Sequence, residues 1–225
     1  MKPRLTLLLI FCTLVQFLSA QEQPDPKKWG VHIAPTSLIN YYPRFRLGTQ
    51  YVSGQYSYLL DVSYANFPSF WGETNYRKGF SYAAIRPEIR RFFTSRPEIN
   101  GGGFFTSDYW GLELALSQLA LDLRADAYEA TDGEQYSFDA ATRTLQRLAI
   151  HYKYGAQRMI SDKIWIDFFA GVGLQLRHIQ YGNFSNRILR FDNPAYEWLF
   201  SFEPKREGWS VRPSFSFGAR IGLAY

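Results

Sequence analysis

The chain has 225 residues, a net charge of +5 and 18% aromatic residues, most of them Tyr and Phe. Its mean hydropathy is mildly negative, and only the N-terminal end has a long apolar run, so a bundle of membrane helices is excluded. Nucleic-acid binding is not indicated either, because no run of five or six like charges occurs. A protein that crosses a membrane with strands is not excluded, since only every second residue of such a strand needs to be apolar.

Residues 1–20 have the order of segments found in an export signal. Lys2 and Arg4 precede an apolar run from Leu5 to Leu18, and two small residues follow it. A membrane-anchoring helix is the alternative, but the run is broken by polar residues and is short against the ~20 residues that span a bilayer. We therefore predict a cleaved signal peptide at 1–20.

The exported chain would have no thiol, because the single cysteine, Cys12, lies inside the signal. Disulfides, thiolate metal sites and a cysteine nucleophile are then excluded. Loss of two basic residues with the signal leaves 23 basic against 20 acidic residues, a net charge of +3. No internal repeat or domain boundary is visible, so we predict a short leader at 21–27 and one domain at 28–225.

Eight segments of this domain alternate apolar residues with small or polar ones. A period of two is the period of a β strand, and membrane strands use it to separate a lipid-facing side from a lumen-facing side. In chain order the segments are 28–34, 44–52, 55–65, 80–93, 110–117, 147–155, 164–177 and 211–225. The first is the weakest, and in the fourth Arg91 falls on the side opposite Arg86, Glu88 and Arg90.

The last segment shows the alternation best. Its apolar side runs without a charge from Val211 to the final residue and includes Phe215, Phe217, Ile221, Leu223 and Tyr225. A terminal aromatic residue after alternating apolar residues resembles the assembly signal of bacterial outer-membrane barrels. The resemblance implies the barrel-assembly machinery as a partner and outer-membrane lipid as the surroundings.

Connection lengths support an even number of strands. With both termini on the periplasmic side, the inner turns would be 53–54, 94–107 and 159–163. Outer connections are expected to be longer, and the segments left for them are 35–43, 67–79, 123–144 and 179–208. The predicted fold is all-β: a transmembrane antiparallel up-and-down β-barrel of about eight strands, with ten as the alternative.

The lumen side of these strands carries many charges. An eight-stranded barrel is only wide enough for side chains to fill it, and isolated buried charges are costly, so charges inside must pair. A structural plug of paired charges is favoured over a proton or ion path and over a carboxylate pair for hydrolysis. The predicted lumen residues are Arg44, Arg46, Asp61, Arg86, Glu88, Arg90, Glu113, Arg147, Lys153, Asp167, Arg177 and Arg220.

No catalytic, cofactor-binding or metal-binding residue is predicted. His32, His151 and His178 lie on separate segments without the close spacing of a metal motif. The glycines at 101–103 lack the strand before and the helix after that would aim backbone amides at a phosphate. A lipid-modifying enzyme that uses His178 or a lumen carboxylate such as Glu113 remains the main alternative to a protein without enzymatic activity.

Three stretches resemble a family of small Gram-negative outer-membrane barrels of unknown function. They are Val31 to Tyr51, with Ala34-Pro35-Thr36-Ser37-Leu38, then Arg86-Pro87-Glu88-Ile89-Arg90, and finally Asp167 to Leu174. The resemblance implies a barrel fold and an outer-membrane location, without an activity to carry over. We therefore expect a non-enzymatic barrel with a structural or surface-interaction role. Alternatives are the lipid-modifying enzyme and an accessory barrel of a secretion or uptake complex.

Overall fold

The structure, a computed structural model, describes residues 29–39, 43–66, 77–93, 107–190 and 205–225. The predicted signal peptide and leader, and the glycines at 101–103, lie outside the described residues. The described chain is all-β apart from the short 3-10 helix η1 (Pro35–Ser37). Its strands are β1 (Trp29–Ile33), β2 (Phe45–Ser53), β3 (Tyr56–Ala65), β4 (Arg77–Phe92), β5 (Ser107–Glu129), β6 (Gln135–Met159), β7 (Ile164–Ser185), β8 (Ile188–Arg190) and β9 (Gly208–Ala224).

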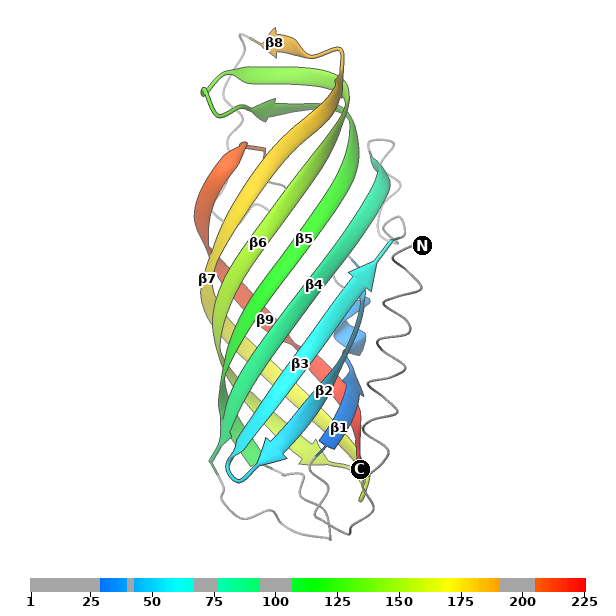
Figure 1. Cartoon of the computed structure of the whole chain (residues 1–225), viewed down its shortest axis with the longest axis vertical. Coiled ribbons are helices and arrows are strands. Elements are labelled where there is room, and N and C mark those ends of the chain that lie inside the picture. The colour runs from blue at the N-terminus through cyan, green and yellow to red at the C-terminus, as the bar shows by residue number, and fades with distance from the viewer. Residues whose placement is uncertain (1–28, 40–42, 67–76, 94–106, 191–204) are drawn as a thin grey trace, which may run out of the picture.

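The strands form one antiparallel sheet that closes into a ring (Figure 1). Consecutive strands pair from β1 to β7, and β9 then joins β7 to β1. The three-residue β8 pairs only with the start of β6, so the ring itself passes through eight of the nine described strands. The prediction of an antiparallel all-β fold is confirmed. The sheet has one strand more than predicted, because β8 comes from a segment interpreted as a loop.

Strands β5, β6 and β7 are much longer than predicted, with 23, 25 and 22 residues. Their pairing continues past Leu123 as far as Glu129 opposite Gln135. The prediction of a loop over 123–144 is therefore wrong, and so is the first part of the loop predicted over 179–208. These additional residues build an extension that rises above one side of the ring (Figure 1).

Along the three long strands, the apolar residues change from the outer face of the sheet to its inner face. On β5, Leu116 still points outward, whereas Leu119, Leu121 and Leu123 are buried inside. Leu116 pairs with Leu148 of β6, and Leu148 pairs in turn with Leu176 of β7. Both partners also point outward, and Leu145 and Ile179 above them are buried. Above this level the outer face carries polar residues such as Gln118 and Asp122. The exchange thus falls at paired positions on three neighbouring strands.

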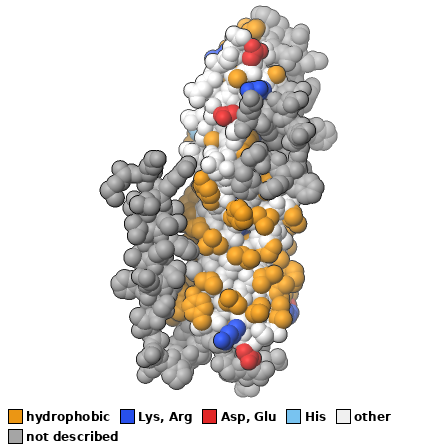
Figure 2. All heavy atoms as spheres, turned by 90° about the vertical axis from the view of Figure 1, so that its right-hand side faces the viewer, with side chains coloured by type: hydrophobic (Ala, Val, Ile, Leu, Met, Phe, Trp, Pro, Cys, Tyr) orange, Lys and Arg blue, Asp and Glu red, His pale blue; other side chains and the backbone are white. Residues whose placement is uncertain are grey.

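Below the exchange the ring is wrapped in exposed apolar side chains (Figure 2). We call this surface the apolar belt. In water so large an apolar surface is unusual for a monomer. All five residues of the predicted assembly signal lie in it. Its residues include Trp29, Ile33, Phe45, Leu47, Tyr58, Leu60, Val62, Ile85, Ile89, Trp110, Leu112, Leu114, Leu116, Leu148, Ile150, Tyr152, Phe168, Val172, Leu174, Leu176, Val211, Phe215, Phe217, Ile221, Leu223 and Tyr225.

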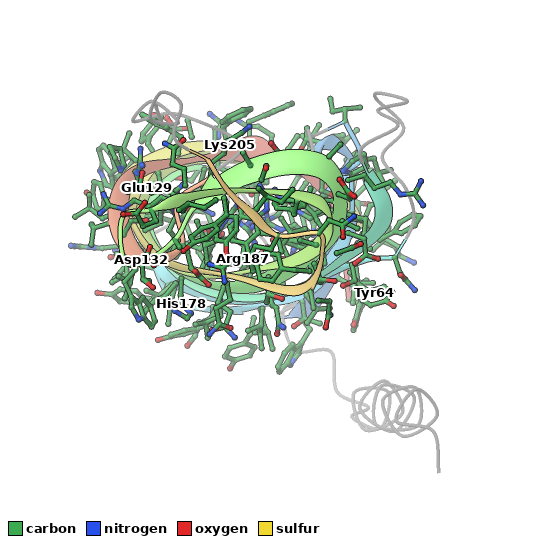
Figure 3. The ribbon with its side chains drawn as sticks, turned by 90° about the horizontal axis from the view of Figure 1, so that it is seen from above. Tyr64, Glu129, Asp132, His178, Arg187 and Lys205 are labelled. Atoms are coloured by element: carbon green, nitrogen blue, oxygen red, sulfur yellow. The ribbon has the colours of Figure 1, made fainter. Side chains whose placement is uncertain are left out.

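The extension has an apolar interior of its own and bends over the mouth of the ring. Tyr128 stacks on Tyr181 with ring centroids 4.4 Å apart, and the Arg187 guanidinium lies 3.7 Å from the Tyr136 ring centroid. The β5–β6 hairpin turns across the opening (Figure 3), and near its tip Ala125 has a φ of +46° while the register of the two strands continues unchanged past it. A water-facing exterior and an apolar interior are what an element outside a membrane requires.

Candidate functional site

Charged and histidine side chains from all eight strands of the ring meet inside it. Four carboxylates, Asp61, Glu88, Glu113 and Asp167, come from β3, β4, β5 and β7, and their side chains have no exposed surface. The cations around them are Arg46 of β2, Arg86 and Arg90 of β4, Lys153 of β6 and Arg220 of β9, with His32 of β1 and His151 of β6. We call these eleven residues the charge network.

Arg220 connects three of the four carboxylates. Its guanidinium nitrogens lie 2.8 Å from Glu88, 2.8 Å from Asp167 and 3.1 Å from Asp61. Arg90 joins Glu88 at 2.6 Å to Asp167 at 2.8 Å. These pairs run across the lumen, because β4 and β7, which carry Arg90 and Asp167, are not neighbours in the ring. Buried charges are tolerated when they are paired and hydrogen-bonded in this way.

The fourth carboxylate, Glu113, lies at the upper edge of the network. It accepts a hydrogen bond from Lys153 at 2.5 Å and lies 3.3 Å from Arg46 and 3.6 Å from Arg86. Lys153 also donates to Glu88 at 2.9 Å, so the two halves of the network are joined. Every carboxylate therefore has at least two cationic partners.

The Phe169 ring fills the space between the cations. The charged ends of Arg220 and Lys153 lie 4.2 and 4.3 Å from its centroid, and both approach its face as cation–π partners do. Gly171 makes room for this arrangement, because a Cβ there would meet the Lys153 side chain at 2.6 Å. Below the network, Trp165, Tyr109 and other aromatic residues close the lower end of the lumen.

The structure places all twelve predicted lumen residues inside the ring, where they are buried or half-buried. Nine of them are joined by ion pairs in the charge network. Arg44, Arg147 and Arg177 lie higher: Arg44 stands 5.0 Å from the Tyr82 ring centroid, and Arg177 donates to Ser210 at 2.6 Å.

Two histidines of the network escaped the sequence prediction. His32 binds Asp61, which is 29 residues away, and His151 Nδ1 lies 3.1 Å from Glu113. The inward parity of both histidines was visible in the sequence. Their partners were not, because the contacts depend on how the strands are staggered around the ring. The third histidine, His178, stacks against Trp209 on the outer rim, 4.4 Å between ring centroids (Figure 3).

A cavity of about 170 Å³ lies directly above the charge network. We call it the chamber. Four arginines line it, together with serine, threonine and glutamine side chains and small alanines, and in the described part of the chain no acidic residue does. The upper interior of the extension begins above Arg147, at Leu119 and Leu145. The chamber is lined, among others, by Thr36, Ser37, Arg44, Arg46, Arg86, Ala115, Arg147, His151, Ser214, Phe215, Ser216 and Phe217.

His151 connects the chamber wall to the network. Its Nε2 lies 2.8 Å from Ser214 Oγ, while its Nδ1 faces Glu113. The order serine, histidine, carboxylate is the order that activates a serine nucleophile. Glu113, however, is also held by Lys153 and accepts a hydrogen bond from Ser216 at 3.2 Å. The same contacts therefore serve equally well as part of the charge network.

Comparisons add no relative to this picture. No family model matches the sequence, and a search of curated proteins finds no match. The resemblance to small outer-membrane barrels therefore stays a prediction. Among the described residues, no helix is long and apolar enough to cross a membrane. In the same residues no group of His, Cys, Asp and Glu side chains is arranged to hold a metal ion.

Proposed function

We propose that this chain is an outer-membrane β-barrel with a closed lumen, which carries the extension on the outer side of the membrane. The observation that carries the proposal is the exchange of polarity at Leu116, Leu148 and Leu176. Apolar side chains facing out and charges facing in suit lipid, and the reverse suits water. An exchange at paired positions on three adjacent strands, within a few Å of one another along the barrel axis, is what the upper surface of a bilayer would impose. The start of β1 and the end of β9, which pair with each other, would then lie on the periplasmic side.

A structural or surface-interaction role fits this interior better than transport. The charge network spans the lumen, aromatic residues close it below, and the apolar interior of the extension fills it above. An eight-stranded ring has little room beyond its own side chains. The extension would be the part presented to the surroundings of the cell, with Glu129, Asp132 and Lys205 around its rim (Figure 3).

The refolded protein is expected to migrate faster on a gel before heating than after it, and to give no large stable conductance steps in planar bilayers. Ion pairs that cross the lumen, such as Arg90 with Asp167, would have to separate to admit hydrated ions. Single-channel recording beside a sixteen-stranded porin in the same lipid provides the measurement and its positive control. Regular open steps of porin size would overturn the closed lumen.

A second candidate, hydrolysis of a lipid ester, is favoured only by the contact of Ser214 with His151 and Glu113. For a non-enzymatic barrel we expect wild type and Ser214→Ala to release equal, background amounts of fatty acid from phospholipid and lipid A. Release by the wild type that Ser214→Ala abolishes would replace the principal proposal. The third alternative, an accessory barrel, would be supported by partners that copurify from native membranes.

A further inference from the structure

The ring is not closed in the same way at every height. β1 pairs with β9 only from Gly30 to Ile33, opposite Ile221 to Ala224. From Ala219 up to Gly208, β9 pairs with β7 alone within the described part of the chain. η1 continues the wall above β1 without a strand ladder, and its Thr36 Oγ accepts a hydrogen bond from the Ala219 amide at 3.2 Å. We call this boundary between η1 and β9 the seam.

The sequence of β9 fits a strand whose upper part has a neighbouring strand on one side. Pro213 lies in the middle of the strand, opposite Leu174 of β7. Proline cannot donate to a β ladder, so in sheets it occurs mainly on strands that have a free edge. At Gly218 a Cβ would lie 2.7 Å from Thr36 Oγ, which shows how closely η1 packs at the lower end of the seam.

The chamber is bounded by β9 at the seam. Phe215 and Phe217 point away from the lumen and are 60% and 73% exposed, yet both line the chamber. Between them along β9 come Ser214 and Ser216, which line it from within. A single cavity therefore touches lumen-facing serines and belt-facing phenylalanines.

The inner end of the chamber is strongly basic. The arginines at 44, 46, 86 and 147 converge on it from β4, β6 and the start of β2. Arg46 and Arg86 also face carboxylates of the charge network below, Arg46 binding Asp61 and Glu113 and Arg86 lying 3.6 Å from Glu113. Arginine is well suited to binding carboxylate and phosphate groups because its planar guanidinium can donate two parallel hydrogen bonds. The serine hydroxyls of β9 add further donors.

We propose that the chamber binds the anionic head of an amphiphile, a phosphate or a carboxylate, whose apolar chain leaves through the seam along Phe215 and Phe217 into the bilayer. The inference rests on the proposed membrane position, because only there do these two phenylalanines face acyl chains. The chamber volume fits a head group and the first carbons of a chain, so the rest of the chain must lie outside the ring.

Binding of radiolabelled dodecyl phosphate to the full mature chain in phosphatidylcholine nanodiscs tests the proposal. Partition into protein-free discs is subtracted. We expect saturable binding to one site that dodecyl maltoside does not displace. Inorganic phosphate should compete roughly a hundredfold more weakly, because it lacks the chain. Competition by dodecanoate then shows whether the chamber prefers phosphate or carboxylate heads, and binding of either supports the proposal.

Two variants locate the site. The double variant Arg44→Gln with Arg147→Gln should weaken binding roughly tenfold or more, since it removes charge-assisted hydrogen bonds. Ala115→Phe should do the same by filling the chamber without a change in charge. The matched control is Arg124→Gln, which removes a charge from the exposed face of β5 and should bind like the wild type.

Equal affinities in all four proteins would overturn the proposal, and so would competition by inorganic phosphate as strong as that by dodecyl phosphate. The shift in gel migration is recorded for every variant, so only folded protein enters the comparison. A folded barrel that binds no anionic amphiphile would refute the binding proposed for the chamber and leave the proposed function intact. A chain that does not insert into lipid would refute the proposed function itself.

Discussion

The Asp167→Asn variant is expected to lose about 3–5 kcal/mol of unfolding free energy, the range found when one partner of a buried ion pair is removed. Asp167 accepts hydrogen bonds from Arg90, Arg220 and Tyr109, each at 2.8 Å. An amide of the same shape keeps the packing but leaves two buried guanidinium groups with less countercharge. Guanidinium-induced unfolding from lipid vesicles, followed by tryptophan fluorescence, measures the loss.

Asp108→Asn is the matched control for this experiment. Asp108 also binds an arginine and a tyrosine, Arg158 and Tyr154, each at 2.6 Å, but on the outer surface at the lower end of β5. Exposed ion pairs contribute little, so we expect a loss below about 1 kcal/mol. Similar losses in the two variants would mean that the charge network does not hold the strands together.

Leu114→Arg is expected to destabilise the membrane-inserted protein by roughly 2 kcal/mol, because Leu114 lies two residues below the level of Leu116, between the interface, where a cation costs about 0–1 kcal/mol, and the middle of the bilayer, where it costs about 2–4 kcal/mol. Leu114 lies on β5 within the apolar belt and is 37% exposed. Its replacement changes no lumen contact, because the side chain points outward. The same unfolding experiment in vesicles gives the value.

Gln118→Arg tests the level at which the belt ends. Gln118 is exposed on the same face of β5, four residues further along the strand and above the exchange of polarity. If that level is the bilayer surface, Gln118→Arg is expected to lower the unfolding free energy by only about 0–1 kcal/mol. Equal losses of unfolding free energy in Leu114→Arg and Gln118→Arg would contradict the proposed membrane boundary, even if the protein remained folded.

The face on which each lumen charge lies could be predicted from the sequence, because the period of two fixes the side of a strand once one residue is placed. The partners could not. Arg220 meets Glu88 across 132 residues of chain, and that meeting depends on strand tilt and register, which no local pattern encodes. The sequence therefore predicts a plug of paired charges, but it does not predict that His32 and His151 belong to it.

The extension was missed for a different physical reason. A search for outward apolar residues ends at Leu116, because Leu119 lies on the opposite face. The alternation then resumes through Leu121 and Leu123 with inverted parity. This change of parity is visible in the sequence, and it indicates a strand that continues while its two faces exchange polarity, rather than a strand that ends.

The unequal strand lengths have a consequence for the lipid around the protein. β2 has 9 residues and β1 only 5, whereas β6 has 25. A tilted strand of nine residues rises about 21 Å, less than the ~25 Å apolar band typical of such proteins. Beside β1 and β2 the bilayer would have to become thinner to match the shorter apolar surface of the barrel. The protein would therefore thin the bilayer on one flank only, the flank that includes the seam.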